Sequence, residues 1–183
     1  NDMSVSRSLI IRCSDAYRRV RNTFRYLLSN LYDFDPNVNT MSYEELLEID
    51  RWALHKTQEL IKDVTLSYES LQLHRVFHNI YNFCTVEMSA FYLDILKDRL
   101  YTFAKNSKER RSAQTVMQYI LVNLVKLSAP VIVHTAEEVW SAISYKDEDV
   151  SSIHLSTFPK CTSAWIDNSL NERWEKLINM KTD

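Results

Sequence analysis

The sequence predicts an all-α protein, folded as an antiparallel helix bundle. Its 183 residues contain no glycine, although a soluble chain of this length carries roughly a dozen on average. Tight β-hairpins favour glycine at a central turn position, so a sheet-rich fold is disfavoured. Only three prolines interrupt the chain. Apolar residues recur at i, i+3 and i+4 along most of the sequence, which is the spacing of one face of a helix.

The first two helices are predicted from this spacing and from the signals between them. The first covers about residues 6–31, and the turn-forming stretch 32–37 ends it. Ser42 and Glu45 are typical of a capping box, in which each side chain satisfies a free backbone N–H at a helix start. The second helix therefore runs from this point to about residue 69.

The middle of the chain is less regular. A third helix is predicted over about residues 71–91, whereas residues 92–106 fit no single period. A fourth helix carries apolar residues from Val116 to Val125 and ends before Pro130.

The remaining elements are shorter. A fifth helix contains Trp140, with Thr135 and Glu138 as a second capping box. Residues 151–159 alternate like a short extended segment, and a last helix covers about residues 168–181. We expect Trp140 to be buried among the other helices.

Length and composition predict a bundle domain over residues 1–145 and a C-terminal extension, an extended segment plus a helix, over 146–183. No apolar run reaches the roughly 18 residues of a membrane span, and no signal peptide is recognised. Three cysteines, odd in number and far apart, indicate free thiols and a cytoplasmic location. Because the sequence lacks an initiator methionine and stops within a helical pattern, we expect a piece of a larger protein.

The net charge of −2 is an average over a chain in which basic and acidic residues are strongly segregated. Residues 3–32 carry six arginines against one acid, and residues 96–111 carry six basic residues against two acids. On a helix, Arg7, Arg18, Arg21 and Arg25 fall within a sector of roughly 60°. Either this is a solvated face paired with acids of a neighbouring helix, or it binds an anionic partner, most simply a nucleic-acid backbone.

Two aromatic residues stand apart from the core pattern. Tyr32 and Phe34 lie in a polar loop just after the arginine-rich helix. An exposed ring at this point could stack on an unpaired base. The alternative is a loop aromatic that closes the end of the bundle.

The sequence offers little support for catalysis. Phosphate-cradling loops need glycine because the backbone must take positive φ or approach the ligand closely, so none can be built here. His74 and His78 have a spacing that can bind zinc, but residue 75 is an arginine and no third ligand is evident. No arrangement of Ser, His and Asp indicates a triad.

The stretch 15–36, DAYRRVRNTFRYLLSNLYDFDP, resembles the first helix and loop of the anticodon-binding domain of bacterial-type isoleucyl-tRNA synthetases. Further stretches match that family in the right order: DRWAL at 50–54, FYLDILKDRLY at 91–101, RSAQTV at 111–116 with LSAP at 127–130, HTAEEVW at 134–140, and IHL at 153–155 with FP at 158–159. The resemblance covers nearly the whole chain. KDRLY at 97–101 looks like the isoleucyl branch, since the valyl branch tends to have proline after the lysine.

The resemblance implies a parent isoleucine–tRNA ligase, which uses ATP to join isoleucine to its tRNA and edits mischarged valine in a separate domain. The family's His-Ile-Gly-His and Lys-Met-Ser-Lys-Ser type motifs are absent here. The chain is therefore expected to be non-catalytic and without a cofactor of its own, while ATP, Mg²⁺ and, in some members, zinc belong to the parent. The implied partners are tRNA(Ile) and the catalytic and editing domains of the same chain; no membrane is implied, and we expect a monomer.

In related synthetases the anticodon meets the end of the first helix with its loop, and the segment that matches residues 92–97. Together with the charge pattern, this predicts the following tRNA-binding residues: Arg18, Arg21, Arg25, Tyr32, Phe34, Lys97, Arg99, Lys108, Arg110 and Arg111. Two alternatives stay open. One is the same domain of a valyl or another class I synthetase. The other is a free-standing helical scaffold that binds an acidic partner.

Overall fold

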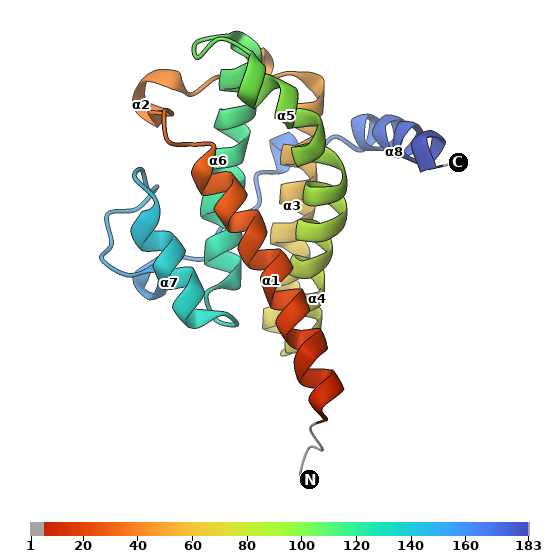
Figure 1. The fold of residues 1–183 in the computed structure, drawn as a ribbon, viewed down its shortest axis with the longest axis vertical. Coiled ribbons are helices and arrows are strands. Elements are labelled where there is room, and N and C mark those ends of the chain that lie inside the picture. Colours follow the sequence, from red (N-terminus) through yellow and green to blue (C-terminus); the bar gives the residue numbers. More distant parts are fainter. Residues whose placement is uncertain (1–5, 183) are drawn as a thin grey trace.

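Two long helices, α3 (Glu48–Glu69) and α6 (Lys108–Ser128), form the centre of the structure, a computed structural model that describes residues 6–182 (Figure 1). Every residue over 120–129 is buried. A helix that is enclosed on all sides must lie inside the bundle, which explains its apolar sequence. Around this pair pack α1 (Arg7–Ser29), α4 (Leu73–Asn82) and α7 (Val133–Ala142).

The other elements are helical as well. They are α2 (Pro36–Asn39), α5 (Leu93–Thr102), α8 (Asn168–Thr182), a π-helix (Phe83–Tyr92) and the 3₁₀ turns Tyr43–Glu45, Ile153–Leu155 and Ser163–Trp165. The described residues contain no strand, so the predicted all-α bundle is confirmed. None of the helices within residues 6–182 is both long and apolar enough to cross a membrane.

The π-helix joins α4 to α5 without a break, so that helical backbone continues from Leu73 to Thr102. At its end the Leu93 N–H donates to the Met88 carbonyl, five residues back. A π-helix has a wider turn than an α-helix. The predicted third helix, 71–91, ends inside this continuous helical backbone, and the stretch 92–106 that fitted no single period contains the α-helix α5 and the loop after it.

Helix α1 projects beyond the rest of the bundle at its N-terminal end (Figure 1). Ser6 caps it by accepting a hydrogen bond from the Leu9 N–H, at 3.2 Å. The first buried residue of α1 is Val20, and Asn30 caps the C-terminal end. The first turns of this helix thus bury no side chain within the described residues.

The hydrophobic core is one cluster that draws on α1, α3, α4, the π-helix, α5, α6 and α7. Its largest fully buried side chains are Trp52 and Trp140. Burial of Trp140 agrees with the sequence prediction and means that α7 faces the core. Losing a buried aromatic of this size costs about 3–5 kcal/mol of unfolding free energy.

The predicted caps and the predicted extended segment need correction. The Ser42 N–H does donate to Glu45 Oε2, at 3.1 Å, but the pair opens a 3₁₀ turn and not α3 itself. The second capping box is wrong: α7 begins at Val133, so Thr135 lies inside the helix and bonds the Tyr17 hydroxyl at 2.8 Å. Residues 151–159 contain the turn Ile153–Leu155 and are not continuously extended.

The turn between α3 and α4 places a leucine in the left-handed region, with φ of 56° at Leu71. The Gln72 N–H donates to the Ser67 carbonyl and the Leu71 N–H to the Tyr68 carbonyl, which is the Schellman pattern. Glycine is the usual residue at this position because a side chain there costs roughly 1–2 kcal/mol.

The C-terminal segment packs on the bundle. Ile153 and Leu170 belong to the common core, and the Asp167 N–H donates to Nδ1 of the buried His55, at 2.9 Å. Trp165 packs edge-on against Tyr119, with ring centroids 4.9 Å apart. The division into residues 1–145 and 146–183 stays a prediction.

Candidate nucleic-acid interface

A hollow of about 440 Å³ opens where the end of α1 meets the end of α5. We call it the tip hollow; its lining is Ser29, Asn30, Tyr32, Leu100, Tyr101, Phe103, Lys105 and Arg110. The Tyr26 hydroxyl donates to the Leu93 carbonyl at 3.2 Å and fastens α1 to α5 just behind it. The hollow therefore lies between two elements that are fixed to one another.

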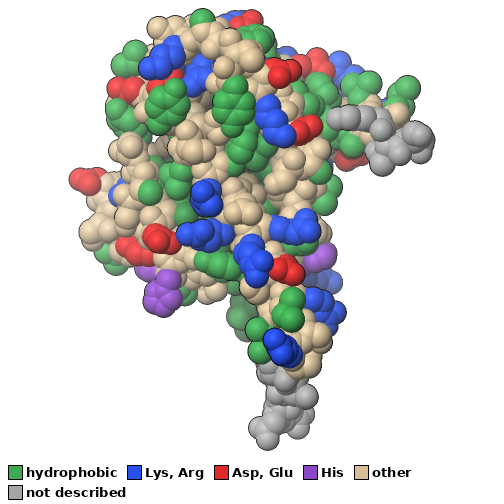
Figure 2. Space-filling model, in the orientation of Figure 1, with side chains coloured by type: hydrophobic (Ala, Val, Ile, Leu, Met, Phe, Trp, Pro, Cys, Tyr) green, Lys and Arg blue, Asp and Glu red, His purple; other side chains and the backbone are tan. Residues whose placement is uncertain are grey.

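Three aromatic side chains of the tip hollow are exposed: Tyr32 by 74%, Tyr101 by 66% and Phe103 by 43%. Lys105 Nζ lies 5.9 Å from the centroid of the Tyr32 ring. Exposed rings beside a basic side chain suit unpaired bases, because the rings stack on the base and the cation meets the phosphate. Figure 2 shows hydrophobic and basic side chains next to one another over the upper part of this face.

Asp33 fixes the backbone beneath the tip hollow. Its Oδ1 accepts hydrogen bonds from Arg110 Nη2 at 3.1 Å and from Gln114 Nε2 at 2.7 Å, and its carbonyl accepts one from Arg111 Nη1 at 3.0 Å. Arg110 also donates to the Leu100 carbonyl. Burial works to raise the pKa of Asp33, but the hydrogen bonds from Gln114 and Arg110 lower it overall. The carboxylate thus joins the loop after α1 to α5 and α6.

A second buried carboxylate lies deeper in the bundle. Asp50 is fully buried and accepts from the Tyr92 hydroxyl at 2.8 Å, the Ser112 hydroxyl at 2.5 Å and Arg99 Nη1 at 2.9 Å. Burial raises the pKa of Asp50, and the Arg99 guanidinium opposes that effect. Arg99 therefore neutralises a core carboxylate that also joins α3, the π-helix and α6.

The arginines of α1 differ from these. Arg18 reaches Asp15 at 3.5 Å in an exposed pair, while Arg21 and Arg25 form no salt bridge with any residue from 6 to 182. We refer to Arg18, Arg21 and Arg25 as the α1 arginines. Figure 2 shows basic side chains spaced along α1 on the same face as the tip. Arg25 precedes Ser29 by one helical turn, about 6 Å of rise. The basic side chains of α1 therefore extend to the edge of the tip hollow.

Five other predicted site residues have the following positions. Lys97 and Lys108 are exposed, and Lys97 donates to Asp94 at 2.7 Å, a contact that raises the pKa of the lysine. Arg99, Arg110 and Arg111 were predicted to bind tRNA, but in the structure they are directed inward toward Asp50 and Asp33. An arginine whose donors are already used by a buried carboxylate has few left for a phosphate.

For Phe34 the structure favours the second of the two alternatives that the sequence left open. Its side chain is only 4% exposed, so it closes the end of the bundle and is not available as a stacking platform. The Phe34 N–H donates to the Leu31 carbonyl, and this turn points its ring inward while Tyr32 faces solvent. Of the two loop aromatics, only Tyr32 has the exposure that stacking requires.

Sequence reasoning missed Tyr101, Phe103 and Lys105 as site residues. They lie at the end of α5 and in the loop before α6, within the stretch that fitted no period. A signal was nevertheless present, because YTFAK at 101–105 places two aromatic residues and a lysine at alternate positions.

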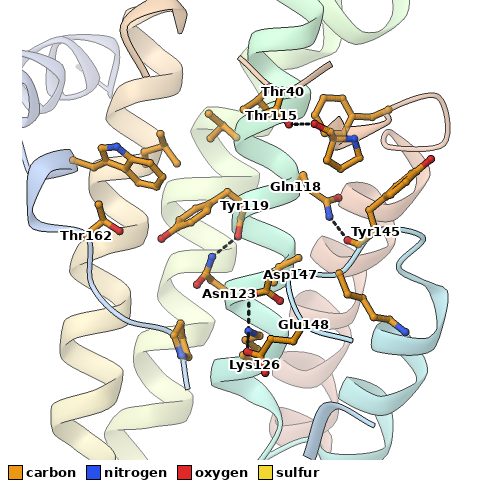
Figure 3. A pocket seen from close by; sticks show the side chains of 18 of the residues that line it. Thr40, Thr115, Gln118, Tyr119, Asn123, Lys126, Tyr145, Asp147, Glu148 and Thr162 are labelled. Atoms are coloured by element: carbon orange, nitrogen blue, oxygen red, sulfur yellow. Dashed lines mark hydrogen bonds and ion pairs between the residues drawn. The ribbon is translucent and has the colours of Figure 1, made fainter. Parts of the chain in front are cut away.

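A larger hollow, of about 920 Å³, lies between α2, α6 and the chain after α7 (Figure 3). Its lining includes Lys126, Lys146 and Lys160, and Lys126 is neutralised by Asp147 and Glu148, each at 2.6 Å. Hydrogen bonds from Lys126 and Thr157 lower the pKa of Glu148 to about 2. These contacts hold the chain after α7 against α6.

Comparison with known families gives a match to the anticodon-binding domain of tRNA ligase over residues 50–182. The chain is also similar over its full length to the isoleucine–tRNA ligases of Geobacter sulfurreducens, at 48% identity, and of a Sulfurihydrogenibium species, at 49%. Similarity to the isoleucine–tRNA ligase of Caldicellulosiruptor saccharolyticus is 47% identity over 98% of the chain. The chain spans about a fifth of the length of these relatives, 20% in each case.

Proposed function

Because the chain belongs to the family of anticodon-binding domains of tRNA ligases, we propose that it binds the anticodon stem and loop of tRNA(Ile). The protein that contains it would be an isoleucine–tRNA ligase. In that protein the chain positions the tRNA for ATP-dependent aminoacylation, which takes place elsewhere in the polypeptide.

The observation that supports this proposal best is the continuity of the tip hollow with the α1 arginines. Exposed Tyr32 and Tyr101 offer faces for unpaired bases, and Arg21 and Arg25 have no salt-bridge partner within residues 6–182. From Arg18 to Ser29 the helix rises about 16 Å. A stem phosphate backbone along α1, with the loop bases at the tip hollow, would use both features together.

The two parts of this surface have different tasks. Arginine contacts to phosphates supply affinity that depends on salt, because each contact releases counterions. Stacking on Tyr32, Tyr101 or Phe103 supplies affinity that depends little on salt and requires unpaired bases. A hairpin with a single-stranded loop satisfies both, whereas a regular duplex or an acidic protein satisfies only the first.

Cofactors, assembly state and location belong to the same proposal. The described residues contain no group of three or more His, Cys, Asp or Glu side chains that could hold a metal ion. We infer that ATP, Mg²⁺ and any zinc are bound in other parts of the polypeptide. Cys13, Cys84 and Cys161 are free thiols, which fits a reducing compartment such as the cytoplasm, and we infer a monomer there.

The test is a salt titration of anticodon stem–loop binding by the full-length protein. Replacing Arg21 and Arg25 by glutamine should weaken binding and flatten the slope of log K against log salt by roughly 0.7–0.9 for each phosphate that the variant no longer neutralises. The matched control is Arg75→Gln, which removes an exposed arginine of α4 far along the bundle from the tip.

Two results would contradict the proposal. One is a double variant that binds the stem–loop like the wild type at every salt concentration. The other is equal affinity for the tRNA(Ile) stem–loop and for a duplex of the same charge, which would favour a scaffold for acidic partners. Preference for the anticodon stem–loop of tRNA(Val) would be compatible with the same binding surface, but it would assign the chain to the valyl branch of the synthetases.

A further inference from the structure

The larger hollow, between α2, α6 and the chain after α7, shares no lining residue with the tip hollow. We call it the α6 hollow. Its volume of about 920 Å³ lies within the roughly 300–1,000 Å³ of small-molecule sites, which are lined mainly by apolar and aromatic side chains with a few polar groups. The α6 hollow therefore has the size of a ligand site that is separate from the surface proposed for tRNA.

Three half-buried rings line the α6 hollow and hold one another in place: Tyr43, Tyr119 and Trp165. The Trp165 ring is parallel to that of Tyr43, with centroids 6.1 Å apart, and lies edge-on to that of Tyr119. The Tyr119 hydroxyl also accepts a hydrogen bond from Gln58 Nε2, at 2.9 Å. Rings packed in this way do not turn freely, so the part of each that faces the hollow is a fixed surface for a planar ligand.

Asn123 adds an unpaired acceptor to this wall. The residue is only 8% exposed, and its Nδ2 donates to the Tyr119 carbonyl at 2.7 Å. Its Oδ1 accepts no hydrogen bond from any residue between 6 and 182. Figure 3 shows Tyr119, Asn123 and Lys126 following one another along the side of α6 that lines the hollow. Because a buried amide oxygen without a partner is costly, a ligand that donates an N–H to it is favoured.

Two lysines that line the α6 hollow have no carboxylate partner within the described part of the chain. Lys146 and Lys160 are exposed and form no salt bridge there, whereas Lys126 is paired with two carboxylates. Lys146 Nζ lies 5.3 Å from the centroid of the Trp140 ring, a contact that orients the ammonium group and leaves its charge in place. Two ammonium groups suit a single phosphate, whereas an RNA backbone requires a longer basic surface.

We propose that the α6 hollow binds a free purine mononucleotide. The base lies against Tyr119 and Trp165, its exocyclic amino group donates to Asn123 Oδ1, and the phosphate meets Lys146 and Lys160. A purine offers a larger ring face than a pyrimidine, and adenine and guanine both carry the amino group. Because α6 and the chain after α7 both contribute to the site, the bound nucleotide stabilises the packing of the C-terminal segment on the bundle.

The experiment is photo-crosslinking of the full-length protein with 8-azido-AMP, followed by mass spectrometry to locate the labelled residues. Since the parent protein is proposed to use ATP elsewhere, only labelling at residues that line the α6 hollow is counted. We expect this labelling to be saturable, with half-saturation below about 1 mM. Unlabelled AMP should compete with it. IMP, whose base has a carbonyl oxygen in place of the amino group, should compete at least about three-fold more weakly.

Two variants test the assigned contacts. Asn123→Leu keeps the size of the side chain and removes the free acceptor, so the concentration of AMP at half-competition should rise by about two- to ten-fold. The matched control is Asn79→Leu on α4, a helix that contributes no residue to the hollow. The double variant Lys146→Gln with Lys160→Gln changes only exposed side chains of the hollow. It should weaken competition by AMP and leave competition by adenosine, which has no phosphate, unchanged.

Three results would overturn the proposal. The first is the absence of saturable labelling at the α6 hollow. The second is equal competition by AMP in the wild type and in the double lysine variant, which decides the matter even if Asn123→Leu does not fold. The third is displacement of the probe by the anticodon stem–loop, since that would make RNA the occupant. The stem–loop affinity of both variants should equal that of the wild type, so the nucleotide site and the tRNA surface can fail separately.

Discussion

The arginines of α1 and those of α5 and α6 look alike in the sequence and differ in the structure. Arg21 and Arg25 have no acid within salt-bridge distance among residues 6–182. Arg99 and Arg110 each reach a buried carboxylate, 49 and 77 residues away along the chain. The difference teaches that a basic cluster is a binding surface only where the fold brings no acid to it. Four predictions test this contrast.

The largest effect is expected at Asp33. Asp33→Ala leaves the buried Arg110 guanidinium without its carboxylate, which should lower the free energy of unfolding by about 3–5 kcal/mol. The control is Asp15→Ala, which removes the exposed partner of Arg18 and should cost about 0–1 kcal/mol. Urea denaturation of both variants measures the difference. Equal midpoints would mean that the inward arginines are no more tightly bound than the outward ones.

The next effect concerns the two loop aromatics. Tyr32→Ala should weaken stem–loop binding by about 1–3 kcal/mol with little change in the salt slope, because the variant removes a stacking ring and leaves the phosphates bound as before. Phe34→Leu keeps an apolar side chain in the buried position and should leave binding unchanged. Direct binding measurements at several salt concentrations compare the two. If Phe34→Leu decreased the affinity more than Tyr32→Ala, the stacking role assigned to Tyr32 would be wrong.

The contrast between paired and unpaired charges extends to Glu148, whose carboxylate forms a salt bridge with Lys126. Its folded pKa of about 2 lies below the ordinary 4.5. The stability that it contributes is therefore present above about pH 4.5 and is lost as the pH falls toward 2. Glu148→Gln should unfold more easily at pH 6 and approach the wild type as the pH decreases through this window. Urea midpoints at a series of pH values test this, and a constant difference down to pH 2 would contradict it.

The smallest effect on stability is expected at Arg25. Arg25→Gln should change the free energy of unfolding by no more than about 0.5 kcal/mol, since its side chain is exposed and unpaired. The same variant should still weaken stem–loop binding. Thermal denaturation beside a binding titration separates the two properties, and destabilisation comparable to that of Asp33→Ala would mean that Arg25 has a structural partner.

The sequence predicted the structure correctly where the deciding pattern involves residues close together along the chain. Helical period and the absence of glycine predicted the bundle, and the spacing around Trp140 predicted the face that α7 buries. The pattern missed α5, which continues from the π-helix without a break, and it failed at Thr135, which lies inside α7 and bonds the Tyr17 hydroxyl.

For the candidate site, the sequence determined which chemistry is present, and the tertiary structure decided which groups are available. The basic segments, the loop aromatics and the resemblance to a tRNA ligase domain can all be read along the chain. The inward direction of Arg99, Arg110 and Arg111, the burial of Phe34 and the meeting of Tyr32 with Tyr101 cannot. Each depends on a partner far away in the sequence, and a charge or a ring becomes part of a surface only when the folded chain leaves it without one.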